Sequence, residues 1–337
     1  MNISEDAYHE YPAWSHSLIA RYAREGFGCI ATLHDKFVPN AAMEFGSLFD
    51  SIITRGRQTL DDYAVMDISV PNAERQALDY LSTCTDKRFE DLDPQYIYDK
   101  CTECGYQKNW GAKAKYDHLS PYAEYYNTKL SGKKIVSRED WNDAMEMARV
   151  FRNDDYLKTI FGTKSTEDIE YLYQLQFCED VLLPSGKQVS VKIMPDLLVI
   201  DHKNKTIQPV DLKTSTNPGW SFDENFIRMR YDLEASVYSD IIALVIDKIP
   251  GYQDYTILPY LFTDISRTDK IPVTMLYPQN DESQQDGFCF TKDGKQYKYK
   301  SWMRLLDEII AYEETQAKVP EHIKLGEPNN ILDLLNR

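Results

Sequence analysis

The sequence lacks any apolar run approaching the ~18 residues that a membrane-spanning helix needs. Its most apolar stretch, residues 241–246, is too short and ends a predicted helix. The N-terminus also lacks the apolar segment of a signal peptide. We therefore expect a soluble cytoplasmic protein without a membrane partner.

Positive charge is scarce, because 38 Lys and Arg residues stand against 54 Asp and Glu residues, a net charge of −16. This excess argues against a protein that coats DNA through a wholly basic surface. It does not exclude a local basic groove, or a site where bound divalent cations supply positive charge to a phosphate.

Closely spaced cysteines are nearly absent. Of six cysteines, only Cys101 and Cys104 form a close pair, and no second pair follows at the spacing of a zinc ribbon. We expect reduced thiols, with a structural metal on Cys101 and Cys104 as the alternative.

The chain has 337 residues, of which 42% are hydrophobic, enough for a substantial core. We expect an α/β (α+β) fold in a single domain, a mixed β-sheet flanked by helices. A mainly helical part would cover 15–165, with an irregular, tyrosine-rich insertion at about 84–137. The sheet core would cover 166–280, and a hairpin and helix would fill 281–337.

Periodicity and capping signals predict individual elements within these parts. Helices are expected at 42–54, 72–81, 141–151, 225–247 and 301–316. Strands are expected at 171–177, 255–262 and 271–277, with a small hairpin pairing 288–291 with 296–299.

One stretch indicates a longer β-hairpin. Its first strand would cover 189–200 and its second 206–214, joined by the polar turn at 201–205. A turn centred between Lys203 and Asn204 places Ile200 opposite Ile207.

The same register places Asp196 opposite Asp211 on one side of the sheet, and Lys213 shares that side. Adjacent buried carboxylates repel unless a cation compensates them. Oxygen ligands on a rigid sheet suit Mg²⁺ or Mn²⁺, and a neighbouring ammonium can orient or deprotonate a bound water. The alternative is a solvated hairpin with an ordinary ion pair.

Pro195-Asp196 and Asp211-Leu-Lys213 resemble the signature of the PD-(D/E)xK nuclease superfamily, in its RecB-like and phage exonuclease (lambda-exonuclease type) branch. The resemblance implies a restriction-endonuclease-like core. It also implies that Asp196, Asp211 and the Leu212 carbonyl hold Mg²⁺ or Mn²⁺.

Two further stretches resemble this branch. Residues 231–238 are similar to its Gln-x-x-x-Tyr helix, with Glu234 in place of glutamine and Tyr238 matching. The resemblance implies that both face the site and orient Lys213 or the DNA. The alternative is a buried tyrosine beside an ordinary surface glutamate. Residues 43–50 resemble its Gly-x-x-x-His helix, with Asp50 replacing histidine as a metal ligand.

Two features of the resemblance stay open. Ser15-His-Ser17 before a helix is similar to the opening of these phage proteins. A further acidic ligand is expected before the Pro-Asp strand, and the candidates there are Glu170, Glu179, Gln174 and Gln176.

The function implied is a Mg²⁺-dependent deoxyribonuclease that hydrolyses phosphodiester bonds. Such relatives are mostly exonucleases of phage DNA recombination that act with a single-strand annealing protein in the bacterial host cytoplasm. A homo-oligomer is compatible with this role. The alternatives are an inert nuclease-like module that binds DNA or protein, and a structure-selective endonuclease.

Residues 106–116 mix cations with aromatic rings, as single-strand binding surfaces do. Lys108, Trp110, Lys113 and Lys115 are therefore candidate DNA contacts. The alternative is a solvated loop with a few anchoring aromatics.

Overall fold

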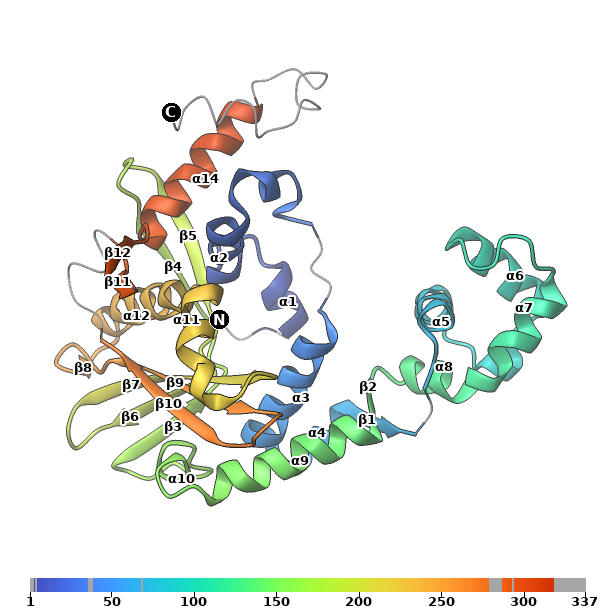
Figure 1. Cartoon of the computed structure of the whole chain (residues 1–337), viewed down its shortest axis with the longest axis horizontal. Helices are drawn as coiled ribbons and strands as arrows, with labels where there is room; N and C mark the ends of the chain where they lie inside the picture. The colour runs from blue at the N-terminus through green and yellow to red at the C-terminus, as the bar shows by residue number, and fades with distance from the viewer. Residues whose placement is uncertain are drawn as a thin grey trace. The chain divides into compact units, whose positions relative to one another are not determined.

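The computed structural model describes residues 3, 5–35, 39–67, 69–278, 287–292 and 294–317. The chain divides into two compact units, one of Met1–Asn40 with Val150–Arg337 and one of Ala41–Arg149 (Figure 1). Within the described ranges, no helix has both the length and the apolar character to cross a membrane.

The first unit contains a mixed sheet in the order β10-β9-β7-β6-β3, with β8 also paired to β7. β9 is buried at every position, as expected of a central strand covered on both faces. The mixed α/β architecture predicted from the sequence is confirmed. The strands are β3 (Ile169–Tyr173), β6 (Leu197–Asp201), β7 (Thr206–Ser215), β8 (Thr256–Ile257), β9 (Tyr260–Ser266) and β10 (Pro272–Tyr277).

β6 and β7 form the predicted hairpin. They are antiparallel, with Ile200 opposite Ile207, so the predicted register is confirmed. Asp201 stabilises the turn by accepting hydrogen bonds from the backbone and side-chain nitrogens of Asn204, at 2.8 and 2.7 Å. Short polar side chains favour such turns because they bond to the nearby backbone.

The prediction of one strand over 189–200 is wrong. β5 (Gln188–Ile193) ends before β6 begins, and Met194, Pro195 and Asp196 separate them. Proline has no N–H and interrupts a ladder of hydrogen bonds. β5 pairs with β4 (Phe177–Leu182) in a separate two-stranded sheet.

Helices join β7 to its parallel neighbour β9, because parallel strands need a long crossover connection. The sequence predicts one helix at 225–247, and the structure has two, α11 (Phe222–Met229) and α12 (Tyr231–Lys248). Arg230 between them has a φ of 61°, in the left-handed region. That conformation ends a right-handed helix.

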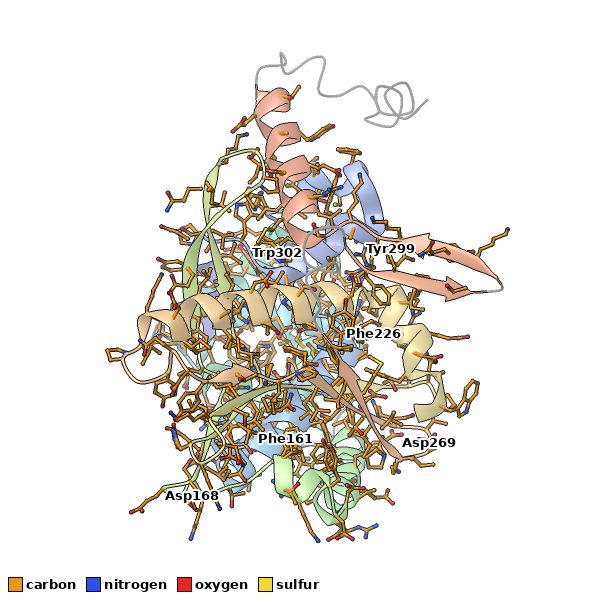
Figure 2. The ribbon with its side chains drawn as sticks, turned by 90° about the vertical axis from the view of Figure 1, so that its left-hand side faces the viewer. Phe161, Asp168, Phe226, Asp269, Tyr299 and Trp302 are labelled. Carbon is orange, nitrogen blue, oxygen red and sulfur yellow. The ribbon has the colours of Figure 1, made fainter. Side chains whose placement is uncertain are left out.

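The core of the first unit gathers around α12. This helix contacts α2 (His16–Glu25), β4 and β5. Tyr231 of α12 and Phe226 of α11 both contact Phe262 of the main sheet. Figure 2 shows α12 running the width of this unit, with Phe226 labelled close to it. α1 (Glu5–Glu10), η1 (Gly26–Thr32), α10 (Leu157–Ile160) and η5 (Gly219–Ser221) complete the helices before the C-terminal part.

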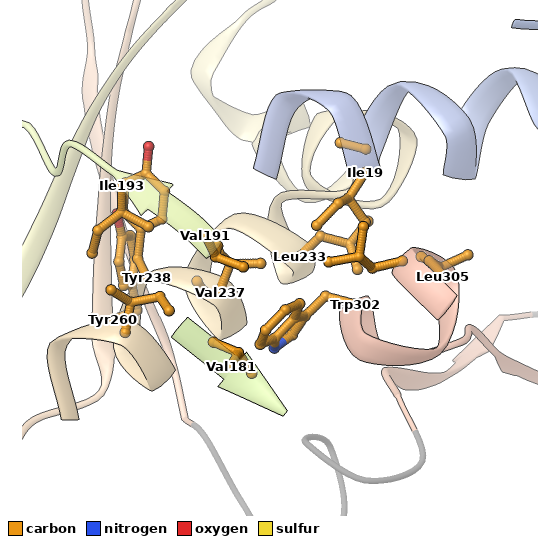
Figure 3. Close-up of a cluster of buried hydrophobic side chains, with 14 of the residues drawn as sticks. Ile19, Val181, Val191, Ile193, Leu233, Val237, Tyr238, Tyr260, Trp302 and Leu305 are labelled. Atoms are coloured by element: carbon orange, nitrogen blue, oxygen red, sulfur yellow. The ribbon is translucent and has the colours of Figure 1, made fainter. Parts of the chain in front are cut away.

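The C-terminal helix α14 (Trp302–Ala317) is tied to this core by Trp302. The Trp302 side chain is fully buried, and its indole N–H donates to Asp240 at 2.7 Å. Figure 3 shows the indole packed beside Val181 and Leu233. The small hairpin before it, β11 (Cys289–Lys292) with β12 (Lys295–Lys298), confirms its prediction.

The second unit has its own core, and the prediction of an irregular segment at 84–137 is wrong. Tyrosines there are buried within helices: the hydroxyl of Tyr126 donates to the Lys87 carbonyl at 3.0 Å, and that of Tyr125 to Asp79 at 2.9 Å. A tyrosine thus fills a core while its polar end keeps a partner. Its main elements are α3 (Ala41–Arg55), α4 (Thr59–Asp62), β1 (Tyr63–Met66), α5 (Asn72–Cys84), α6 (Pro94–Glu103), α7 (Ala112–Leu119), α8 (Ala123–Leu130), β2 (Lys134–Ser137) and α9 (Arg138–Asn153), with short turns η2 (Gly56–Gln58), η3 (Phe89–Asp91) and η4 (Ser120–Tyr122).

Candidate functional site

Asp211 and Lys213 project from the same face of β7, since residues two apart on a strand share a side. Lys213 Nζ lies 2.8 Å from Asp211 Oδ2. Asp211 is only 3% exposed. β7 is paired on both edges, with β6 and β9, so the two side chains rise from a fixed backbone.

Asp196 reaches the same place from the break between β5 and β6. Its Oδ2 accepts a hydrogen bond of 2.7 Å from the N–H of Leu212, the residue between Asp211 and Lys213. Its backbone carbonyl accepts from the Gln174 N–H at 3.1 Å. The structure therefore brings Asp196, Asp211 and Lys213 together.

Glu234 and Tyr238 come from α12, one helical turn apart. Glu234 Oε2 lies 2.8 Å from Lys213 Nζ, so the ammonium is held between two carboxylates. The ring of Tyr231 covers Lys213, with Nζ 4.8 Å from the ring centroid. Glu234 is 4% exposed, which excludes the alternative of an ordinary surface glutamate. Tyr238 is also buried and packs against Tyr260, as Figure 3 shows.

The charges of these groups depend on one another. Burial by itself would lower the Lys213 pKa, but Asp211 and Glu234 raise it well above its ordinary value, so the amine stays an ammonium. Burial raises the pKa of Asp211, and repulsion from Glu234 raises it further, against the effect of Lys213. A buried carboxylate stays ionised only where a positive charge lies beside it.

His16, at the start of α2, is a site residue that was not among the predicted site residues. Its Nε2 lies 3.3 Å from Glu234 Oε1, and its ring packs edge-on against Tyr238 with 5.1 Å between centroids. Burial, followed by the charge of Lys213, lowers the His16 pKa to about 3, so the imidazole is neutral. The Ser15-His-Ser17 motif was the only sequence signal for it.

The donor set fits a small divalent cation. Asp196, Asp211 and Glu234 bring three carboxylates against the single ammonium of Lys213, and the neutral His16 adds no charge. A cation would balance this excess. Among the described residues, no group of three or more His, Cys, Asp or Glu side chains is arranged to hold a metal. Mg²⁺ needs only one or two carboxylates, because waters and phosphate complete its shell.

Three of the remaining candidate ligands have other partners. Asp50 is on α3 in the second unit, and its role stays a prediction. Gln176 bonds to the backbone of Ile3, Glu179 pairs with Lys248, and Glu170 lies 3.5 Å from His202. The identity of a further acidic ligand therefore stays open.

The candidate DNA contacts of the second unit differ from one another. Lys115 is fully buried, with its Nζ donating to Thr102 Oγ1 at 2.8 Å, so its prediction as a surface contact is wrong. Lys113 is 87% exposed and pairs with Asp117 at 2.6 Å. Trp110 packs edge-on against His118, and Lys108 is exposed.

No protein-family model matches the chain, and no curated protein matches it significantly. A solved structure described as "Crystal structure of SSO0001" is similar over 80% of this chain and 84% of that one. The two share 8% sequence identity and a TM-score of 0.28.

Proposed function

We propose that the first unit is a metal-dependent DNA nuclease with a restriction-endonuclease-like core. The observation that carries this proposal is the position of Lys213, 2.8 Å from both Asp211 and Glu234, with Asp196 fixed on the backbone between Asp211 and Lys213. Rigid, buried carboxylates beside a lysine are the residue types that phosphodiester hydrolysis requires.

Asp196 and Asp211 would hold Mg²⁺ or Mn²⁺, with the Leu212 carbonyl as the further ligand that the sequence resemblance implies. A divalent cation in such a site polarises the phosphoryl group and lowers the pKa of a bound water. The Leu212 N–H holds one oxygen of the Asp196 carboxylate at the backbone of β7, at the residue that follows Asp211.

Lys213 would orient the attacking water and hydrogen-bond to the phosphate. Because its pKa is raised, it acts as a hydrogen-bond donor and a positive charge rather than as a base. Glu234 and Tyr231 restrict the ammonium to one position. Preorganised donors of this kind stabilise charge that builds up in a transition state.

The narrower assignment to an exonuclease of phage recombination rests on the sequence resemblance. A structure-selective endonuclease would use the same side chains, and the two differ in whether the enzyme needs a DNA end.

The test compares wild-type protein with Lys213→Ala on end-labelled linear duplex and on covalently closed circular DNA, with Mg²⁺. Lys205→Ala is the matched control, because Lys205 lies in the turn of the same hairpin and pairs with exposed Asp254. We expect Lys213→Ala to lose about 10²-fold or more of the cleavage rate, as removal of one preorganised donor does, and Lys205→Ala to keep it. Cleavage of the linear substrate alone identifies an exonuclease. Equal cleavage by all three proteins, or none by wild type with any divalent metal, would overturn the proposal.

A further inference from the structure

Trp220 is the most exposed large hydrophobic residue of the described chain, at 80% exposure. In contrast, Trp302 is fully buried. An indole exposed to water does not contribute the hydrophobic stabilisation that its burial would provide. Ile271, whose backbone carbonyl lies next to the preceding Gly219, is also exposed, at 57%.

The backbone that carries Trp220 is held firmly. The hydroxyl and the backbone N–H of Ser221 both donate to the Pro218 carbonyl, at 2.8 and 2.9 Å. The Gly219 N–H donates to Asp269 at 3.0 Å, which ties this turn to the loop between β9 and β10. Figure 2 labels Asp269 at that loop. The exposed ring therefore projects from a fixed turn.

Close packing fixes the turn further. A Cβ on Gly219 would lie 2.8 Å from the Val273 side chain and 3.2 Å from the Ile271 carbonyl. Only glycine fits such a close approach without a shift. This contact also places the turn directly beside Ile271.

The turn follows the end of β7, the strand that carries Asp211 and Lys213. β7 and β9 are parallel, and Ser215 lies opposite Ser266, so the loops that follow both strands leave from one edge of the sheet. In sheets with parallel strands, ligands bind outside the carboxyl ends of the strands. Lys213 is only two residues inside this edge, or ~7 Å along the strand.

Charges of both signs lie near Trp220 in the chain and the fold. Asp223 and Glu224 follow it on α11 and are exposed, and Arg267 and Lys270 belong to the loop that Asp269 ties to this turn. The face of an unpaired base carries no such charge and stacks on indole whatever its sequence.

We propose that Trp220 stacks on an unpaired base of the DNA strand whose phosphate enters the Lys213 site. This inference rests on the proposed nuclease function and adds a substrate property to it: the strand is single, or frayed, next to the bond that is cut.

The experiment measures binding of a labelled single-stranded oligonucleotide by fluorescence anisotropy, with Lys213→Ala as the non-cleaving background. Trp220→Ala and Trp220→Phe are added to that background. Leu276→Ala is the matched control, because Leu276 is a 54% exposed hydrophobic residue on β10. We expect Trp220→Ala to weaken binding about 5- to 150-fold, the range for one stacked base. Phenylalanine should recover part of the loss, and Leu276→Ala should match the background.

Binding of equal strength in all four proteins would overturn the stacking role. So would a Trp220-dependent dimer in sedimentation with unchanged oligonucleotide affinity, which would assign the surface to a second copy of the chain. If wild type cleaves DNA but Trp220→Ala binds it normally, only this inference fails. If binding depends on Trp220 but wild type cleaves nothing, only the nuclease proposal fails.

Discussion

Replacing Glu234 by glutamine removes one negative charge from the candidate site and keeps a hydrogen-bond acceptor for Lys213. Burial raises the Asp211 pKa, and Glu234 raises it further. The substitution should therefore lower the Asp211 pKa. Because a cation binds the ionised carboxylate, metal binding should persist to a lower pH in the variant.

The geometry sets the size of the effect. Asp211 Oδ2 and Glu234 Oε2 each lie 2.8 Å from Lys213 Nζ, so they are at most twice that distance apart. Two unit charges ~5.5 Å apart interact by about 3 kcal/mol at an effective dielectric constant of ~20. That energy corresponds to a pKa change of about 2. Lys213 screens part of it, so we expect the Asp211 pKa to fall by about 1 to 2.

The assay is Mn²⁺ affinity by calorimetry between pH 5 and pH 8, each protein being compared with its own plateau at pH 8. Below the Asp211 pKa, protons compete with Mn²⁺ and the affinity should fall about tenfold for each pH unit. This decline should begin about 1 to 2 pH units lower in Glu234→Gln. Asp247→Asn, an exposed carboxylate on the same helix, should follow wild type. A decline at the same pH in all three proteins would refute the electrostatic coupling of Glu234 to Asp211.

Two further predictions concern stability. Burial raises the Asp240 pKa to about 6, above its unfolded value, so ionisation of this group costs folding free energy; the cost sets in above about pH 4 and is complete above about pH 6. Asp240→Asn keeps an acceptor for the Trp302 indole N–H. It should raise the free energy of unfolding by at most about 3 kcal/mol at pH 8 and leave it unchanged at pH 4. An equal gain at both pH values in urea unfolding would contradict this. Lys192 is 5% exposed and donates to the carbonyls of Tyr8, His9 and Tyr11 at 2.6–2.9 Å. Lys192→Met should cost roughly 2–4 kcal/mol because it leaves buried carbonyls unpaired, and an unchanged urea midpoint would show that water replaces the ammonium.

Local signals in the sequence predicted much of the site. The turn at 201–205 and the alternating apolar residues around it predicted the β6–β7 register. The two-residue spacing of Asp211 and Lys213 on β7 predicted that they share one face. Helical spacing likewise placed Glu234 and Tyr238 together. Such short-range patterns depend only on strand and helix geometry.

Other features depend on contacts between distant segments. His16 reaches Glu234 from more than 200 residues away in the chain, which no spacing rule could indicate. Lys115 is buried because Thr102 and the Tyr98 ring accept its ammonium. The left-handed Arg230, which divides the predicted helix, donates to the Lys300 carbonyl at 3.3 Å and lies 4.2 Å from the centroid of the Tyr299 ring. In each case a tertiary partner overrides what the local sequence favours.

Anomalous diffraction from Mn²⁺-soaked crystals would show whether Asp196 and Asp211 jointly hold a divalent cation beside Lys213. We expect an anomalous peak in contact with both carboxylates in the wild-type protein, and its loss in Asp211→Asn. Well-ordered Asp196 and Asp211 side chains without a peak between them at millimolar Mn²⁺, or a peak that persists in Asp211→Asn, would contradict this expectation.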